Sequence, residues 1–387
     1  MLWINFLHLY QPLNSEPYAI KEATEASYKR VVDLLEAHPE LNFTLNISGG
    51  LVFRWQEMGY SELIERIKKL VRAGQVELTG SAAYHCLMPL TPQEEVRNQI
   101  RENTEILKQN FGSDIELKGF FLPEMAYSAE VAQLVQEEGF SWIILDEIAY
   151  SGRLEEPDRP QAVRDKNSGL QVVFRSRSYS NSYVPLLIRK ELKKGEDKTV
   201  ITATDGELYG FRHNDPKGVL EKLPQDPNLK TETISEFLNN FGSLSEAGVE
   251  PCNWESVPEE LQREEPYASW RKRDNELQEM LWEFAYWVYD VVENRQEDEN
   301  YYWARWHLIR GWSSCTFWWA SAQDFAYIYG PYAWNPDEVE KGVNEFVRAI
   351  RSLEDPSTKD IKIQAEKKYI KIKEELWRKH WEEYWRK

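Results

Sequence analysis

The sequence predicts an α/β protein of parallel β/α units, followed by an α-helical region. Short apolar, β-branched runs alternate with amphipathic segments through the first two-thirds of the chain, which is the pattern of strands joined by helical crossovers. The strand runs are short and apolar, as expected when both faces of a parallel sheet are buried. After about residue 230 the strand pattern stops, and longer segments with helical periodicity follow.

Seven strands are predicted in chain order. A barrel and an open doubly wound sheet would both accommodate them. No GxGxxG follows the first strand, so a dinucleotide-binding sheet loses support. The predicted strands cover residues 1–9, 41–48, 75–81, 115–124, 141–147, 170–177 and 198–205.

Helix patterns separate these strands, and two of them carry clear end signals. Residues 61–74 begin with Ser61 as a predicted N-cap and close on Gly74. Residues 91–112 open with Thr91 as the predicted cap and Pro92 at the first helical position. The other helix patterns cover residues 27–39, 128–140 and 180–192.

The C-terminal region shows helical periodicity in residues 267–295, 337–353 and 367–387. We expect the apolar stripes of these helices to cover other apolar surface. The first segment places Trp270, Leu277, Leu281, Phe284, Val288 and Val291 on one face, and the last places Ile370, Trp377, Trp381 and Tyr384 on one stripe.

The length of 387 residues suggests two or so domains. We predict a β/α barrel-type domain over residues 1–240 and a helical domain over residues 241–387 that contributes to the cleft. No stretch approaches the ~20 apolar residues of a membrane span, and the apolar N-terminus is interpreted as a strand and not as a signal peptide. Cys86, Cys252 and Cys315 are far apart and no CxxC occurs, which favours a cytoplasmic protein without a disulfide framework.

The formal net charge of −18 argues against nucleic acid as the main partner, because neutralising phosphates requires a basic surface. A neutral substrate fits better. The 16 Trp, 20 Tyr and 15 Phe residues mildly favour a carbohydrate, since aromatic faces stack on sugar rings, although many of them must form the core. The sequence leaves the oligomeric state open.

Polar residues recur where the predicted strands end. In parallel β/α proteins the active site forms at the carboxyl ends of the strands, so these residues should open onto a common mouth. They are His8, Tyr10, Gln11 and Pro12 after the first strand, Tyr84 and His85 after the third, Pro123, Glu124 and Tyr127 after the fourth, Asp146 after the fifth, and Asp205 and Glu207 after the last.

Two kinds of catalytic site are compatible with these residues. A metal site built from His8, His85 and Asp205 has suitable ligand types, but the six histidines form no HxxxH or HExxH pair. A Ser–His–Asp hydrolase is disfavoured because no GxSxG elbow occurs. The alternative is a pair of carboxylates that cleaves a glycosidic bond, and Glu124 and Asp205 lie at two different strand ends, as such a pair requires.

Five stretches, taken in order, resemble the motifs of glycoside hydrolase family 57. They are HLYQP at 8–12, GQVELTG at 74–80, GFFLPEMAYS at 119–128, TDGELYG at 204–210 and the Trp-rich LIRGWSSCTFWWAS at 308–321. Each motif is short, and the match depends on their order and spacing. Many members carry an Asp in the last motif, where this chain has Cys315, and this departure leaves the subfamily open.

The resemblance implies a fold and a mechanism. The family has an incomplete barrel of seven β/α units followed by a helical domain, acts on α-linked glycans with retention of configuration, and needs no metal or other cofactor. Its nucleophile falls on Glu124, its acid/base on Asp205, and the histidine that lines its sugar subsite on His8. A Tyr–His pair of some members falls on Tyr84 and His85. Further candidates for substrate contact are Tyr10, Gln11, Tyr127, Glu207, Trp312, Trp318 and Trp319, of which the three tryptophans also fit a helical core.

We therefore expect a retaining α-glycosidase or transglycosylase with α-amylase-like or 4-α-glucanotransferase activity on an α-glucan or oligosaccharide. The position of Asp205 after an apolar strand should raise its pKa, helped by repulsion from Glu124. Three alternatives stay open: an α-galactosidase of the same family, a metal-dependent polysaccharide deacetylase on a similar barrel, and a catalytically silent glycan-binding protein.

Overall fold

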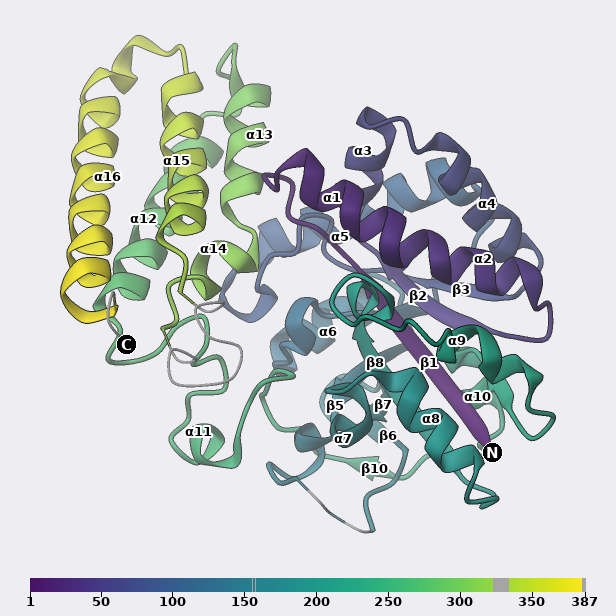
Figure 1. The fold of residues 1–387 in the computed structure, drawn as a ribbon. Coiled ribbons are helices and arrows are strands. Elements are labelled where there is room, and N and C mark those ends of the chain that lie inside the picture. The colour runs from purple at the N-terminus through teal and green to yellow at the C-terminus, as the bar shows by residue number, and fades with distance from the viewer. Residues whose placement is uncertain (155, 157, 323–333, 385–387) are drawn as a thin grey trace. The chain divides into compact units, whose positions relative to one another are not determined.

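The computed structural model describes residues 1–154, 156, 158–322 and 334–384. It divides into two compact units, Met1–Ala83 with Met88–Pro258 and Tyr84–Leu87 with Glu259–Lys387, which we describe separately (Figure 1). Residues 241–258 therefore group with the strand-containing unit.

Seven parallel strands form the barrel of the first unit. One sheet runs in the order β3-β2-β1-β8, and the other contains β7-β5-β4. Every residue of β2 and of β5 is buried, as expected of strands covered on both faces. The seven strands are β1 (Leu2–Leu9), β2 (Phe43–Ile47), β3 (Val76–Thr79), β4 (Gly119–Phe120), β5 (Trp142–Asp146), β7 (Gln171–Arg175) and β8 (Thr199–Asp205).

The two sheets join at two seams. After β3, Gly80 donates a backbone hydrogen bond to Gly119 O and accepts one from Phe121 N, both at 2.9 Å. After β7, Ser176 N donates to Ile201 O of β8 at 2.9 Å. The strands close on themselves in this way, which confirms the incomplete (β/α)7 barrel and excludes the open doubly wound sheet.

Three short strands were not predicted. The strand β6 (Ala162–Asp165) runs antiparallel to β7, β10 (Glu246–Ala247) runs parallel to β6, and β9 (Lys230–Glu232) pairs with the first half of β1. These strands have two to four residues, which is too short to show an alternating pattern in the sequence.

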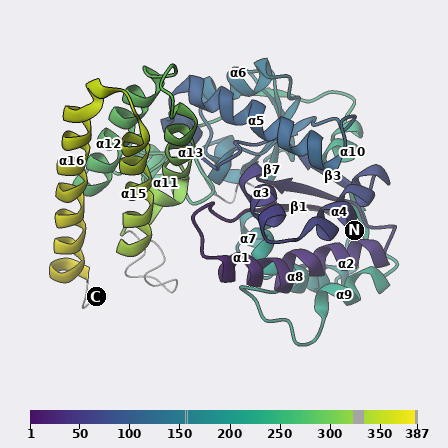
Figure 2. The ribbon, with the colours of Figure 1, turned by 90° about the horizontal axis from the view of Figure 1, so that it is seen from above.

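Helices connect the strands and lie along their outside, as α2, α4 and α5 do beside β1–β3 in Figure 2. The helices of this unit are α1 (Pro17–Ala23), the π-helical turn η1 (Thr24–Tyr28), α2 (Lys29–Ala37), α3 (Gly49–Glu57), α4 (Ser61–Arg72), α5 (Gln93–Phe111), α6 (Ala129–Glu137), α7 (Arg177–Ser180), α8 (Val184–Leu192), α9 (Val219–Lys222) and α10 (Ile234–Asn239). Short 3₁₀ turns follow some strands and helices: η2 (Met88–Leu90), η3 (Pro123–Met125), η4 (Glu147–Tyr150), η5 (Gly206–Tyr209) and η6 (Leu223–Gln225).

Two helix starts differ from the prediction. The helix α4 begins at Ser61, but its N-cap is Tyr60 and no side chain caps it. The helix α5 begins at Gln93, and Pro92 is its N-cap instead of its first helical residue. The reason is that Pro92 has a ψ of 135°, outside the helical range, while its carbonyl already accepts from Val96 N.

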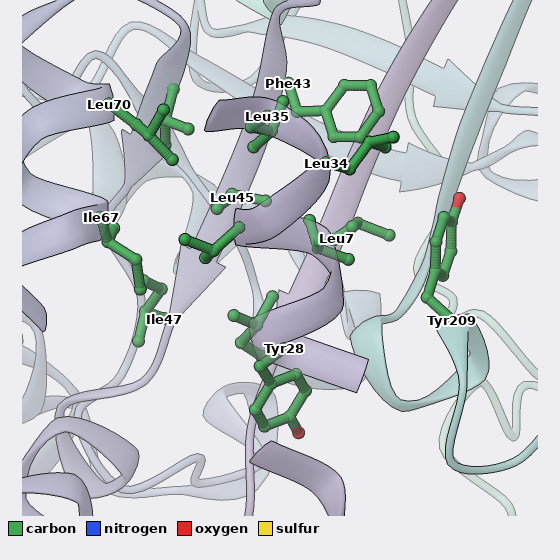
Figure 3. Packing of buried hydrophobic residues seen from close by; sticks show 14 of the residues in the cluster. Leu7, Tyr28, Leu34, Leu35, Phe43, Leu45, Ile47, Ile67, Leu70 and Tyr209 are labelled. Carbon is green, nitrogen blue, oxygen red and sulfur yellow. The ribbon is translucent and has the colours of Figure 1, made fainter. Parts of the chain in front are cut away.

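The core of the first unit lies between the strands and their covering helices. Figure 3 shows Leu45 and Ile47 of β2 together with Leu35 of α2 and Ile67 of α4, all of them buried. This packing fixes the helices against the barrel, and the barrel in turn positions the strand ends that follow.

The second unit is helical, as predicted. Its core is aromatic: Trp282 stacks on Phe317 with ring centroids 3.7 Å apart, and Trp270 and Trp312 are also buried. Among the described residues, no helix of the chain is long and apolar enough to cross a lipid bilayer. The helices are α12 (Glu276–Glu293), α13 (Tyr301–Gly311), α14 (Ser314–Trp318), α15 (Pro336–Ser352), α16 (Lys359–Lys379) and the π-helical turn η10 (His380–Tyr384), with the 3₁₀ turn η9 (Pro356–Thr358) before α16 and the short α11 (Pro258–Gln262) at the unit boundary.

The predicted buried face is correct for α12 and wrong for α16. Leu277, Leu281, Phe284 and Val288 of α12 are buried, but Ile370 and Trp381 of the last helical segment are 52% and 56% exposed. The helix α16 instead buries Ala365, Ile372 and Leu376. The physical reason is that periodicity shows which residues share a face, but not which face meets a neighbouring helix.

Candidate active site

The register of the barrel places His8 between Asn46 of β2 and Asp205 of β8. The His8 ring is buried, and its Nδ1 lies 2.7 Å from Asn46 Oδ1. The Asn46 amide nitrogen donates to Thr79 Oγ1 at 3.2 Å, which orients Oδ1 toward His8. Because an amide oxygen only accepts, the proton of the neutral ring lies on Nδ1, and Nε2 carries the lone pair. Burial lowers the pKa of His8 to about 4, so the ring is neutral at pH 7.

Asp205 is the last residue of β8 and is partly buried. Burial is the main cause that raises its pKa to about 7, and the charge of Glu207 is the next. Arg175 and Arg212 act in the opposite direction. The rise follows the expectation from the sequence, with Glu207 as the largest charge contribution where we had expected Glu124. At neutral pH a large fraction of Asp205 is protonated, as a general acid requires.

Glu124 lies in a tight turn directly after β4. Its φ of 62° and the φ of 49° at Met125 are in the left-handed region, which costs roughly 1–3 kcal/mol for each non-glycine residue. Hydrogen bonds from Met125 N to Leu122 O at 2.7 Å and from Trp254 N to Glu124 O at 3.0 Å hold this turn. Strain of this kind persists only where the surroundings impose it, and it is concentrated at functional sites. The Glu124 side chain is 8% exposed.

The segment 252–256 reaches this turn from outside the strand series. Tyr127 N donates to Cys252 O at 2.8 Å, so the segment is anchored at Glu124 and again three residues later. The Trp254 ring lies 6.2 Å from the His8 ring and 6.1 Å from the Phe121 ring, between centroids. We did not predict a role for Trp254, because a lone Trp in an irregular segment carries no periodic or motif signal.

A buried ion pair network lies beside Trp254. Arg175 Nε donates to Asp146 Oδ2 at 2.7 Å, and Arg177 binds the same carboxylate. The Arg175 guanidinium lies 5.5 Å from the centre of the Trp254 ring. Asp146 also accepts from Ile148 N at 3.1 Å and so caps the turn that follows β5. Its carboxylate is therefore committed to structural contacts.

Gln11 and Glu207 bind each other next to Asp205. Gln11 Nε2 donates to Glu207 Oε1 at 2.6 Å, and Arg212 Nε donates to Glu207 Oε2 at 2.9 Å. The Tyr10 ring stacks on the His8 ring with centroids 5.5 Å apart. Four candidates from the first and fourth motifs thus lie near Asp205, at the carboxyl ends of β1 and β8. They are His8, Tyr10, Gln11 and Glu207.

Tyr127 differs from the expectation of a substrate contact. Its side chain is fully buried, and its hydroxyl donates to Asp165 Oδ2 at 3.0 Å, at the end of β6. The Tyr127 side chain therefore supports the loop after β6. The residue follows a motif position, but the turn at Glu124 directs its side chain into the protein.

The remaining candidates belong to the second unit. His85 Nδ1 lies 2.9 Å from Ser314 Oγ, and Ser314 N donates to His85 O at 2.8 Å, while Tyr84 beside it is largely buried. Trp312 is fully buried among aromatic rings of the helical core, which argues against a sugar platform at this position. Trp318 and Trp319 are partly exposed, with rings 4.7 Å apart.

Cys315 is partly buried and forms no disulfide with another described cysteine. In the part of the chain that the structure describes, no group of three or more His, Cys, Asp or Glu side chains could hold a metal ion. The described site contains carboxylates, a neutral histidine, the Gln11 amide, arginine side chains and aromatic rings.

An incomplete β/α barrel with acidic side chains at the carboxyl ends of two strands defines a class, the barrel-type carbohydrate-active enzymes. The chain belongs to glycosyl hydrolase family 57: the model of this family matches residues 5–249. The alpha-amylase of Pyrococcus horikoshii is 25% identical in an alignment of 264 residues, which covers 62% of this chain and 40% of that protein. The 4-alpha-glucanotransferase of Thermococcus litoralis is 24% identical in an alignment of 265 residues, which covers 62% of this chain and 39% of that protein.

Solved structures share the fold. The 4-alpha-glucanotransferase from Thermococcus litoralis has a TM-score of 0.71 at 17% identity and covers 92% of this chain and 59% of its own. A GH57-type branching enzyme from Pyrococcus horikoshii has a TM-score of 0.69 at 14% identity and covers 95% of this chain and 94% of its own. The chain thus matches about two-fifths of the length of the curated relatives, whereas the fold extends over most of the chain.

Proposed function

We propose that this protein is a retaining enzyme for α-linked glucans, with Glu124 as nucleophile and Asp205 as acid/base. The observation that carries the proposal is that the carboxyl groups of Glu124 and Asp205, each after the carboxyl end of a barrel strand, have different surroundings. Burial and the charge of Glu207 keep Asp205 protonated near neutral pH, whereas Glu124 is presented on a strained turn after a different strand. Membership of family 57 supports the same assignment.

In the first step Glu124 attacks the anomeric carbon, and the bond to the leaving sugar breaks. The proton of Asp205 passes to the leaving glycosidic oxygen, so that a neutral hydroxyl departs. The neutral His8 ring, with the lone pair of Nε2, accepts a hydrogen bond from a sugar hydroxyl. Trp254, beside His8 and Phe121, offers an aromatic face to the sugar ring.

In the second step the ionised Asp205 removes a proton from the acceptor hydroxyl, whose oxygen attacks the anomeric carbon of the glycosyl–enzyme; the ester bond to Glu124 breaks and Glu124 leaves as a carboxylate. Water as acceptor gives hydrolysis, and a sugar hydroxyl gives a 4-α-glucanotransferase reaction. The names of the related amylases and glucanotransferases favour α-1,4-glucan as substrate for this chain. A contribution of Tyr84, His85, Trp318 and Trp319 to substrate binding, and of the helical domain to the cleft, stays a prediction from the sequence.

A cytoplasmic location belongs to the same proposal. It is supported by the three cysteines, Cys86, Cys252 and Cys315, which form no disulfide with one another in the described part of the chain.

The test is a product profile. The protein is incubated with maltoheptaose, and separately with an aryl α-galactoside, alongside Glu124→Gln and Asp205→Asn. Each variant has a matched control eight residues upstream, Glu116→Gln and Asp197→Asn, whose side chains are 77% and fully exposed. We expect maltooligosaccharide products from the wild type and both controls, and a loss of at least roughly 100-fold in the two site variants.

The products decide between the two reactions. Shorter maltooligosaccharides alone mean hydrolysis, and longer ones as well mean transfer. Release of the aryl group from the galactoside, with no products from maltoheptaose, would mean that the substrate is an α-galactoside and not an α-glucan. Full activity in either site variant would overturn the assignment of that residue, and no turnover by the wild type on either substrate would overturn the proposed function.

A further inference from the structure

A π-helical turn interrupts the first helix of the barrel beside the candidate acid/base. The turn η1 (Thr24–Tyr28) lies between α1 and α2, and such turns are rare and often occur at functional sites. Thr24 fixes it from inside: its hydroxyl donates to Ile20 O at 2.7 Å and accepts from Trp55 Nε1 at 2.9 Å. The wider turn directs Ala26, Ser27 and Tyr28 toward the loop after β8.

Ser27 binds Glu207 within the 3₁₀ turn η5 that follows Asp205, and Phe211 two residues beyond that turn. Its Oγ donates to Glu207 O at 2.9 Å and accepts from Phe211 N at 2.8 Å. Phe211 N also donates to Glu207 O at 3.1 Å, so the Ser27 hydroxyl ties a turn that is already closed by its own backbone to η1. The free energy at stake is that of the two hydrogen bonds that Ser27 makes.

Arg30, at the start of α2, binds the same loop at two points and the helix α9 at a third. Its Nη1 donates to Tyr209 O at 3.0 Å, its Nη2 to Asp215 Oδ2 at 2.8 Å, and its Nε to Glu221 Oε1 at 2.5 Å. Asp215 is fixed in turn by the Tyr183 hydroxyl at 2.7 Å. One guanidinium therefore joins the turn after Asp205 to the more distant part of its loop.

The backbones approach each other closely at this contact. A Cβ at Gly210 would lie 2.0 Å from Ala26 O, and a Cβ at Gly206 would lie 3.2 Å from the Tyr28 ring. Tyr28 and Tyr209 are both buried in the cluster drawn in Figure 3. The loop is thus seated against η1 by shape as well as by hydrogen bonds.

We propose that Ser27 and Arg30 are positioning residues for Asp205: by holding the turn from Gly206 to Phe211 against η1, they keep the Asp205 carboxyl in line with the leaving oxygen. The inference rests on the proposed function. Neither side chain touches the reacting atoms in this account, and both act through the backbone of the loop. Displacement of a reacting group by about 1 Å costs on the order of 100-fold in rate.

The test uses the dependence of the rate on the leaving group. A sugar hydroxyl leaves only with the help of a proton, whereas fluoride leaves without one. We therefore compare kcat/KM for maltoheptaose and for α-maltotriosyl fluoride, because kcat/KM reports the steps up to release of the leaving group. For Arg30→Met we expect a fall of roughly 10- to 100-fold on maltoheptaose and less than about 3-fold on the fluoride.

Arg66→Met is the matched control. Arg66 also binds two carboxylates, Asp33 and Glu36, and its side chain is 20% exposed, as is that of Arg30. It makes no hydrogen bond to the loop after β8 among its described contacts. We expect similar activity to the wild type on both substrates. Arg30→Lys should restore part of the activity on maltoheptaose.

Ser27→Ala gives a second, smaller change in case Arg30→Met does not fold, and it should show the same selective loss. An equal loss on both substrates would overturn the positioning role, as would a selective loss in Arg66→Met. Failure of the proposed function is distinguishable, because it would show as absence of wild-type turnover on both substrates, and it would overturn both claims together.

Discussion

The side-chain amide of Gln11 donates a 2.6 Å hydrogen bond to Glu207, across 196 residues of sequence. Arg212 binds the other oxygen of the same carboxylate at 2.9 Å. The charge of Glu207 is thereby held two residues from Asp205, where it is the largest charge effect that raises the pKa of Asp205. A carboxylate that the sequence suggested as a substrate contact thus also raises the pKa of the proposed acid.

Glu207→Gln should move the alkaline limb of the pH profile to lower pH. The substitution removes the negative charge, while the new amide can still accept from Gln11. The pKa of Asp205 then falls from about 7, so less of it is protonated at pH 8, and kcat/KM at that pH drops several-fold against the wild type. The measurement is kcat/KM for maltoheptaose between pH 5 and 9.

Arg212→Gln provides the control of opposite sign. It removes a positive charge that lowers the pKa of Asp205, so the alkaline limb should move to higher pH. The other charged groups that act on Asp205, Arg175 and Glu255, are unchanged in both variants. A shift of both variants in the same direction would contradict the electrostatic account.

Asp205→Asn should stabilise the protein at alkaline pH. The pKa of Asp205 is about 7 in the folded state and near 3.8 when unfolded, so the folded state binds the proton more tightly. Stability therefore falls as pH rises from about 4 to 7, and removing the carboxyl recovers up to about 4 kcal/mol at pH 8 but little at pH 4. Urea unfolding at the two pH values measures this, and equal effects at both would exclude it.

His8→Gln should also change how the free energy of unfolding depends on pH, with a sign opposite to that of Asp205→Asn. Burial lowers the pKa of His8 to about 4, below the unfolded value of 6.5, so the unfolded state binds the proton more tightly between these values. Stability contributed by the neutral ring is lost as pH falls through this window, by up to about 3 kcal/mol. Unfolding curves at pH 5 and 7 should show a smaller pH dependence in the variant, and an unchanged slope would contradict the prediction.

Trp254→Ala should weaken substrate binding more than it slows chemistry. The ring lies beside His8, Phe121 and Arg175, and aromatic contacts of this kind contribute roughly 0.5–1.5 kcal/mol. We expect KM for maltoheptaose to rise roughly 3- to 10-fold, with partial recovery in Trp254→Phe. Trp381→Ala removes an exposed tryptophan of the helical unit and serves as the control. Unchanged KM in Trp254→Ala would remove this residue from the site.

Gly210→Ala should destabilise the barrel and impair activity. The added Cβ would lie 2.0 Å from Ala26 O, and both groups belong to the backbone, so relief requires the loop to move. Overpacking of this kind costs roughly 1–3 kcal/mol. The midpoint of denaturant unfolding should fall, whereas Gly242→Ala, which meets nothing within 4 Å, should leave it unchanged. Equal midpoints for the two variants would show that the contact at Gly210 yields easily.

Much of the barrel could be predicted because the pattern of apolar residues within each of its longer strands indicates that strand. The alternating apolar residues of β2 and the continuous apolar run of β5 both indicate strands, and the structure buries every residue of the two. The strand ends at His8, Glu124 and Asp205 then follow from the general geometry of parallel β/α proteins. The short strands β6, β9 and β10 could not be found, because two to four residues carry too little pattern.

Side-chain direction at the site could not be predicted in the same way. Tyr127 stands in a motif that resembles a catalytic loop, yet the left-handed backbone at Glu124 and Met125 turns it toward Asp165. Asp146 stands at a strand end like Asp205, yet Arg175 and Arg177 occupy its carboxylate. In both cases the position after a strand was predicted correctly. The residue that each side chain binds was not, because that residue lies far away in the sequence.

The sequence by itself determined the alternation of strands and helices, the polar residues at the strand ends and the order of the family motifs, because each of these is a property of neighbouring residues. Only the tertiary structure decided the approach of Trp254 to His8, the contact of Gln11 with Glu207, the seating of the Asp205 loop on η1 and the buried face of α16. The physical reason is that these contacts join segments far apart in the chain. Their formation depends on how whole elements are packed, which local periodicity does not encode.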